Sequence, residues 1–228
     1  MKKDKNLLSE LRTYMIIVGS FLIFMTFFVN LTGHSAIGFT GLWYELDMRI
    51  EGSLATWLES SLIFLCVIPC YLIFRSTEKP KVVRGFFLLM VFAVIFLSAD
   101  EMLSIHEYMG QKILEISGIG NGTFLEGFTW VLIYAPAGLV GLVLFLITTR
   151  KLFLTADKRV RRRLILDLFI MFISVAGVLS LEVFEAYVYS LDSNALIGPS
   201  FEESFEILVI LGFLDFSLTT YGMDNVTS

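Results

Sequence analysis

Carboxylates and a histidine beside apolar segments are the residues of this sequence that could do chemistry. The stretch FLSADEMLSIHEYMG, residues 96–110, passes from an apolar run into Asp100, Glu101, His106 and Glu107. An ionisable group inside a membrane-spanning helix is costly unless it is paired, hydrated or bound to a metal. These residues are therefore candidates for a functional site.

Helical spacing divides this first group. With about 100° of rotation per residue, Asp100 and Glu107 share a helix face with Ser104, whereas Glu101 and His106 lie toward opposite sides. His106 can join the acids only if the helix breaks or bends near Ser104.

Two further groups of acids occur near the C-terminus. Glu182 and Glu185 are three residues apart at the end of an apolar run, where the helix dipole disfavours acids. Glu202, Glu203 and Glu206 project from one face at the start of the last apolar run. Glu202 and Glu203 also have an ordinary structural explanation, because acidic residues are common in the first turn of a helix, near the positive end of its dipole. Like charges at this spacing repel, and in a low dielectric they must take up protons, cations or a metal.

Six apolar runs can position these residues. The chain has 228 residues, of which 56% are hydrophobic and 17% charged, and its mean hydropathy is +0.78. A membrane-spanning helix needs about 20 apolar residues, and the runs are roughly 14–32, 54–74, 85–105, 128–149, 164–187 and 202–222. This pattern predicts an all-α integral membrane protein, with residues 1–228 forming a single domain of six transmembrane helices. Short repeated motifs with an acid at the ends of the runs favour an arrangement of three helical hairpins.

The basic residues predict the orientation of these helices. Fifteen of the 17 Lys and Arg residues lie before the first run, between the second and third, or between the fourth and fifth; the exceptions are Arg49 and Lys112. By the positive-inside rule, both termini are cytoplasmic (N-in/C-in) in a multi-pass protein of the plasma (inner) membrane. Fifteen of the 22 acids fall toward the opposite, outer side.

Two local features complete the predicted architecture. Apolar Ile105, Met109, Ile113 and Ile116 recur at helical spacing before Gly118, which predicts an amphipathic surface helix that ends at this glycine. In the fourth run, Pro136 of YAPAGLVGL predicts a kink.

The three acidic groups predict one site where the outer ends of the third, fifth and sixth helices meet. Hard oxygen ligands favour a divalent Ca, Mg, Mn or Fe ion, and Zn is an alternative if His106 and His34 take part. Glu101 and Glu203 are the candidate catalytic carboxylates. The candidate metal ligands are Asp100, His106, Glu107, Glu182, Glu185, Glu202 and Glu206.

Three functions are compatible with such a site. The first is a metal-dependent membrane enzyme that acts on a lipid or a small periplasmic substrate, because the acids lie at one shallow depth. The second is a divalent-cation transporter, which Asp215 inside the last run and Pro136 favour. The third is a non-catalytic sensor or partner subunit, in which a cation ties helices together.

The expected partners follow from the same composition. They are the lipid bilayer and a lipid or small-molecule substrate, and a homo-oligomer is compatible with the sequence. The basic run Arg159–Arg163 is an anchor for lipid headgroups rather than a nucleic-acid patch.

Overall fold

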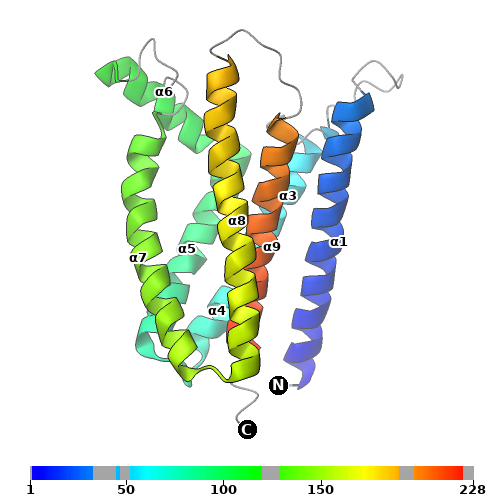
Figure 1. Ribbon diagram of the computed structural model, residues 1–228, viewed down its shortest axis with the longest axis vertical. Helices are drawn as coiled ribbons and strands as arrows, with labels where there is room; N and C mark the ends of the chain where they lie inside the picture. Colours follow the sequence, from blue (N-terminus) through cyan, green and yellow to red (C-terminus); the bar gives the residue numbers. More distant parts are fainter. Residues whose placement is uncertain (1, 33–44, 47–51, 120–128, 190–197, 223–228) are drawn as a thin grey trace.

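The computed structural model describes residues 2–32, 45–46, 52–119, 129–189 and 198–222, and these contain helices and no strands (Figure 1). Six segments are long and apolar enough to cross a membrane, as the sequence predicts. The helices are α1 (Lys2–Thr32), α3 (Leu54–Leu65), α4 (Val67–Arg75), α5 (Lys81–Leu103), α6 (Ile105–Ser117), α7 (Val131–Thr155), α8 (Lys158–Tyr189) and α9 (Gly198–Gly222).

Several helices extend beyond the predicted apolar runs. The fourth was expected to end at residue 149, but α7 continues to Thr155, and α8 begins six residues before the expected start at residue 164. These extensions hold Arg and Lys, whose long side chains allow a helix to continue past the apolar region while their charges stay in water. The hydropathy pattern therefore locates the helices but underestimates their basic ends.

The second candidate membrane span is broken at Cys66 into α3 and α4. Pro69 lacks an N–H group, and a proline ring displaces the carbonyl four residues earlier, which here belongs to Leu65. The Cys66 N–H bonds to the Ile63 carbonyl at 3.0 Å, three residues back. In contrast, α7 continues through Pro136 without interruption.

Helix α9 is the central element of the bundle. It packs along α8 and α1 and also contacts α4, and α1 packs more against α9 than against α3, its neighbour in the chain. A first buried cluster joins α9 to α1 and α3 through Met15, Leu62 and Ile207. The three predicted hairpins therefore do not pack as three separate pairs.

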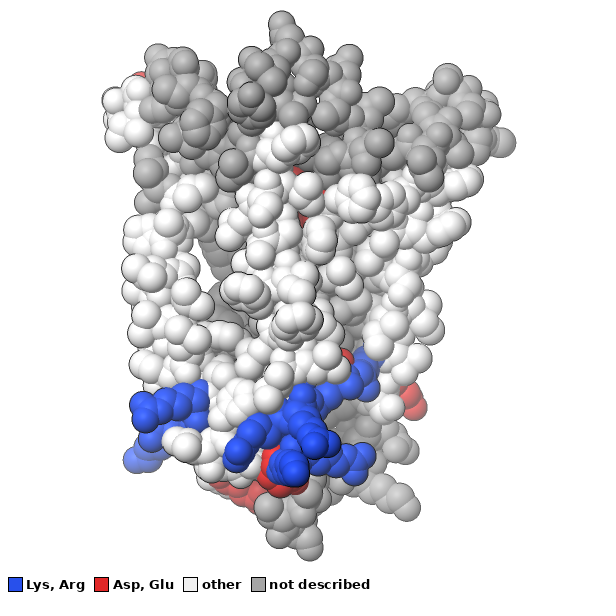
Figure 2. All heavy atoms as spheres, viewed as in Figure 1, with Lys and Arg blue, Asp and Glu red and all other residues white. Residues whose placement is uncertain are grey.

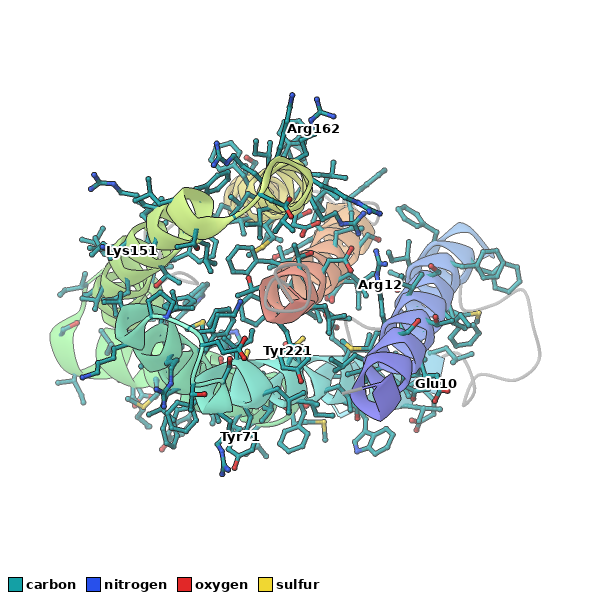
Figure 3. The ribbon with its side chains drawn as sticks, turned by 90° about the horizontal axis from the view of Figure 1, so that it is seen from below. Glu10, Arg12, Tyr71, Lys151, Arg162 and Tyr221 are labelled. Carbon is teal, nitrogen blue, oxygen red and sulfur yellow. The ribbon has the colours of Figure 1, made fainter. Side chains whose placement is uncertain are left out.

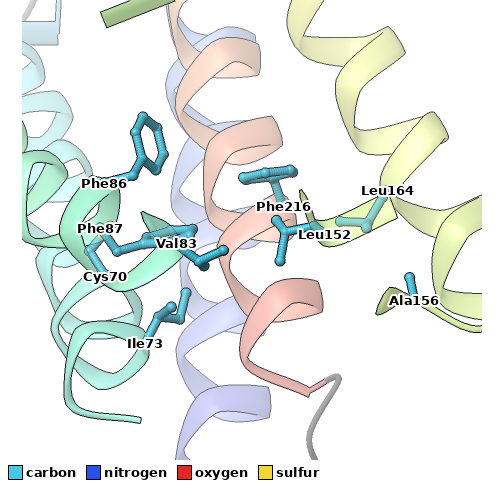
Figure 4. Close-up of a cluster of buried hydrophobic side chains, with 9 residues drawn as sticks. All are labelled: Cys70, Ile73, Val83, Phe86, Phe87, Leu152, Ala156, Leu164 and Phe216. Carbon is cyan, nitrogen blue, oxygen red and sulfur yellow. The ribbon is translucent and has the colours of Figure 1, made fainter. Parts of the chain in front are cut away.

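A second buried cluster packs between α4, α5, α7, α8 and α9 (Figure 4). Phe216 of α9 stacks on Phe87 of α5 and meets Phe145 of α7, with ring centroids 6.3 and 5.3 Å apart. Phe86 of α5 is 5.9 Å from Phe145. We call these four residues the aromatic floor; they tie α7 to the rest of the bundle.

Basic residues gather at the end of the bundle where α1 begins and α9 ends (Figures 1 and 2), which we call the basic end. Arg12 points from α1 toward α9 (Figure 3), and its Nε lies 2.6 Å from Asp215. Arg163 of α8 reaches the same carboxylate at 2.5 Å. The neighbouring Asp167 of α8 lies 3.2 Å from Arg163 and accepts a hydrogen bond from Thr219. This network joins α1, α8 and α9.

The predicted surface helix is confirmed. Helix α6 ends at Ser117, and Gly118 follows in the left-handed conformation, with φ of 66° and a 2.8 Å hydrogen bond to the Leu114 carbonyl. On its surface, Lys112 pairs with Glu115 at 2.6 Å, and this hydrogen bond and negative charge raise the pKa of Lys112.

Glycines allow α8 and α9 to approach closely. A Cβ atom on Gly177 of α8 would lie 2.8 Å from the Phe205 ring of α9, and one on Gly212 of α9 would lie 2.8 Å from Met171 of α8. Small residues at such contacts let transmembrane helices pack backbone to side chain.

We predict that Gly177→Leu destabilises the bundle because the added side chain overlaps Phe205. Overpacking of this kind costs about 1–3 kcal/mol, which thermal unfolding of the purified protein in detergent would detect as a lower midpoint. Gly141→Leu on α7 is the matched control, since its Cβ meets no described atom within 4 Å. Equal midpoints for the two variants would contradict this packing.

Candidate functional site

A break between α5 and α6 brings His106 back to Asp100. Ser104 adopts the left-handed conformation, with φ of 47° and ψ of 43°, so the chain turns at the residue where a bend was required. The backbone N–H of His106 donates to Asp100 Oδ1 at 2.8 Å, and its ring Nδ1 lies 3.2 Å from Oδ2. Asp100 thus satisfies a free N–H in the first turn of α6 and orients the imidazole.

Aromatic side chains at the start of α7 contact this Asp100–His106 pair. The Tyr134 hydroxyl donates to Asp100 Oδ1 at 3.3 Å. The His106 ring meets Trp130 edge to face at 5.3 Å between centroids. Thr129 fixes α6 further by donating to the Gly110 carbonyl at 2.7 Å. The carboxylate of Asp100 is therefore buried but well supplied with hydrogen bonds.

A second group of acids lies between α3 and α9. Carboxylate oxygens of Glu59, Glu203 and Glu206 all lie within 4.8 Å of one another, and we call these residues the acidic cluster. No other group of three or more potential metal ligands occurs among the described residues. Three carboxylates at this spacing can share one cation, because oxygen ligands of this type bind hard divalent metals.

Glu59 is the most unusual member of the acidic cluster. Its side chain is only 1% exposed, and within the described part of the chain neither carboxylate oxygen has a hydrogen-bond partner. The negative charges of Glu101, Glu203 and Glu206 act on it as well. Burying a carboxylate without a partner is strongly unfavourable, so a proton or a cation would stabilise this residue.

Two serines hold Glu59 in this position. Ser60 of α3 donates to the Ser98 carbonyl of α5 at 2.6 Å, and Ser98 donates to the Ser60 carbonyl at 2.9 Å. The hydroxyl oxygens are 2.9 Å apart. Since Ser60 follows Glu59 and Ser98 precedes Asp100 by two residues, the contact joins the two helices beside the site.

The Asp100–His106 pair and two members of the acidic cluster, Glu59 and Glu206, line one cavity of about 470 Å³. Its polar end holds Glu59, Asp100, Glu101, His106 and Glu206, and no Lys or Arg side chain is among the described residues that line it. The remaining walls are mostly apolar and come from α3, the start of α7, α5, α8 and α9. Met90, Met171 and Phe213 line the cavity and also pack on the buried cluster that contains the aromatic floor. The cavity is therefore polar at one end and closed at the other.

The structure brings the predicted residues together only in part. Glu203 and Glu206 join in the acidic cluster, and Glu101 lies beside it. Asp100 and His106 bind each other and do not belong to that cluster; Glu202 is not a member either. The side chains of Glu107, Glu182 and Glu185, and the whole of His34, lie outside the described residues.

Sequence analysis missed the contribution of Glu59. The residue could have been found by the rule that singled out the other acids, because it lies inside the apolar run 54–74. Its closeness to Glu203 and Glu206, 144 or more residues away, depends on how α3 and α9 are rotated, which spacing along the chain does not determine.

A family model named domain of unknown function (DUF8692) matches residues 12–219. The chain belongs to this family. No curated protein and no solved structure matches it. The matched DUF8692 region includes the acidic cluster, the Asp100–His106 pair and all residues that line the cavity.

We predict that Glu59→Met stabilises the metal-free protein, because it replaces an unpaired buried carboxylate with an apolar side chain of similar length. Such replacements often gain about 1–4 kcal/mol, measurable as a higher thermal midpoint in chelator. Asp100→Asn is the contrasting control and should lower the midpoint, since the Asp100 carboxylate is hydrogen bonded. A lower midpoint for Glu59→Met would mean that Glu59 has a stabilising partner.

Proposed function

We propose that this chain is a membrane-embedded, metal-dependent enzyme whose site opens from the acidic cluster into the apolar cavity. The observation that carries this proposal is Glu59, which is buried without a hydrogen-bond partner among the described residues and faces two further carboxylates. A divalent cation would neutralise most of this charge. The substrate would be a lipid or a small molecule that reaches the cavity.

The ligand set favours a hard metal ion. All three members of the acidic cluster offer carboxylate oxygen, which suits Ca²⁺, Mg²⁺, Mn²⁺ or iron better than zinc. Zinc would need nitrogen from His106, and this histidine is engaged with Asp100.

The surrounding residues supply groups that could transfer protons. A metal on the acidic cluster would polarise a substrate oxygen or activate water. Glu101, which lies near Glu59 and lines the cavity, is the candidate general base. His106 is a second candidate, because Asp100 at Nδ1 leaves Nε2 as the nitrogen that can exchange a proton with a bound group.

Three observations favour an enzyme over a transporter. Asp215 is bound by Arg12 and Arg163, so it is not available to an ion in this arrangement. Pro136 interrupts no helix. The cavity ends on the buried cluster of the aromatic floor, so it does not continue to the basic end. Transport of metal into liposomes that is abolished by Asp215→Asn would overturn this choice.

The orientation that fits this proposal places the basic end in the cytoplasm and the acidic cluster near the outer face of the plasma membrane. The concentration of Arg and Lys at one end supports it.

We predict one divalent metal ion per chain in the purified protein, measured by elemental analysis. Glu59→Gln, Glu203→Gln and Glu206→Gln should each weaken metal binding by at least the roughly 10–100-fold typical of residues that only support a ligand. The control is Glu202→Gln, from the same turn of α9 but outside the acidic cluster. A wild-type protein without stoichiometric metal, after purification with each candidate ion, would exclude the metal centre.

A separate prediction concerns orientation. In a variant with Cys66→Ala and Cys70→Ala, Ser117→Cys on α6 should react with a membrane-impermeant maleimide on intact cells. Thr77→Cys, in the turn between α4 and α5 at the basic end, should react only after the cells are permeabilised. The reverse pattern would place both termini outside.

A further inference from the structure

The walls of the cavity differ in their exposure. Cys66 and Val94, which line it, are only 2% and 5% exposed. In contrast, Leu97 of α5 and Val175 and Leu179 of α8 also line it and are 47%, 42% and 58% exposed. Helix α7 packs on α5, and α8 packs on α9, rather than on each other, and Figure 2 shows the surface hollowed between α7 and α8. These segments are candidate membrane spans, so in the proposed orientation the cavity opens sideways to lipid.

At its closed end, the described walls of the cavity offer only hydrocarbon and sulfur. They come from Met90 of α5, Met171 and Val178 of α8, and Ile210 and Phe213 of α9. An apolar cavity of this kind stays free of water, and side chains that face an empty space lose van der Waals contacts. A hydrocarbon chain from the surrounding bilayer is therefore the occupant that suits both the walls and the opening.

The length of the cavity matches an acyl chain. Its lining on α5 includes Asp100 at the polar end and Met90 at the closed end, and these positions are roughly 15 Å apart along the helix axis at about 1.5 Å per residue. The hydrocarbon core of a bilayer is about 30 Å thick, so one leaflet contributes about 15 Å. A chain that spans one leaflet therefore extends over the length of the cavity.

We infer that the cavity binds one acyl chain of a bilayer lipid, which enters sideways between α7 and α8. The methyl end of the chain lies against Met171 and Phe213, and its carbonyl end lies at the level of Glu59 and Asp100. This places the carbonyl group beside the acidic cluster, where a bound metal would polarise it. The inference rests on the proposed function, because it names the substrate class of the same site.

The experiment uses the full-length protein in phosphatidylcholine vesicles, in which a small fraction of the lipid carries a photoactivatable diazirine near the end of one acyl chain. Mass spectrometry then locates the labelled residues. Cys66 and Phe213, which line the cavity, should be labelled at least ten-fold more than Cys70, which is buried and does not line it. We call labelling at Cys66 and Phe213 interior labelling. Phe172, which is 74% exposed on α8, reports contact with the bulk lipid.

The position of the diazirine tests the direction of the chain. A diazirine next to the carbonyl group should move the label on α9 from Phe213 to Val209, which lines the cavity one turn closer to Glu206. Labelling in the reverse order would overturn the inference.

Blocking variants test whether the cavity is the binding site. Ala93→Phe should fill part of it and reduce interior labelling at least five-fold, while labelling at Phe172 stays unchanged. Val175→Trp, at the half-exposed opening, should do the same if Ala93→Phe does not fold. Leu139→Phe on the exposed face of α7 is the control. Interior labelling that is no higher than that at Cys70, or that is unaffected by both blocking variants, would overturn the inference.

Metal analysis of the same samples separates the two proposals. Ala93→Phe should keep its metal while losing interior labelling, because it leaves the acidic cluster intact. Stoichiometric metal without interior labelling would overturn this inference and leave the metal centre standing. Interior labelling of a protein that binds no metal would support the cavity as a site for an acyl chain and overturn the metal-dependent function.

Discussion

The ion pairs of Asp215 with Arg12 and Arg163 fix the central helix on which the rest of the structure depends. They hold α9 against α1 and α8 at the basic end. Glu206 lies nine residues earlier, which on a helix is a rotation of about half a turn. When Asp215 faces the two arginines, Glu206 must face the other side of α9, where Glu59 and Glu101 lie. The network at one end therefore sets the orientation of the acids at the other end.

The cost of burying Glu59 is balanced by contacts that hold its helix in place. The reciprocal bonds of Ser60 and Ser98 keep α3 against α5, so α3 cannot rotate to bring the carboxylate into water. Hydrogen bonds between membrane helices contribute only about 0.6 kcal/mol each on average, but several at one place remove the freedom to relax. The protein thus retains a carboxyl group that is costly to bury next to a cavity, which is typical of a functional site rather than of a packed core.

Much of the fold could be predicted from the sequence because each helix carries its own hydropathy signal. The end of α6 at Gly118 and the need for a bend at Ser104 followed from local spacing. The break at Cys66 is a local effect of Pro69, three residues later in the sequence. The acidic cluster could be predicted only for Glu203 and Glu206, which share one helix face; Glu59 belongs to another helix, and which acids meet depends on packing between distant segments.

The two buried carboxylates of the cavity differ in how they are compensated, and this difference assigns them different chemistry. Asp100 accepts hydrogen bonds from a backbone N–H and a tyrosine hydroxyl and also contacts an imidazole, so it serves to orient His106. Glu59 receives no such hydrogen bond from the described residues and lies among like charges, so it must recruit a cation or a proton. Pairs of acids whose environments differ in this way commonly divide the roles of a reaction between them. Since one cavity holds both, a bound substrate would meet the charged ligand set and the oriented histidine together.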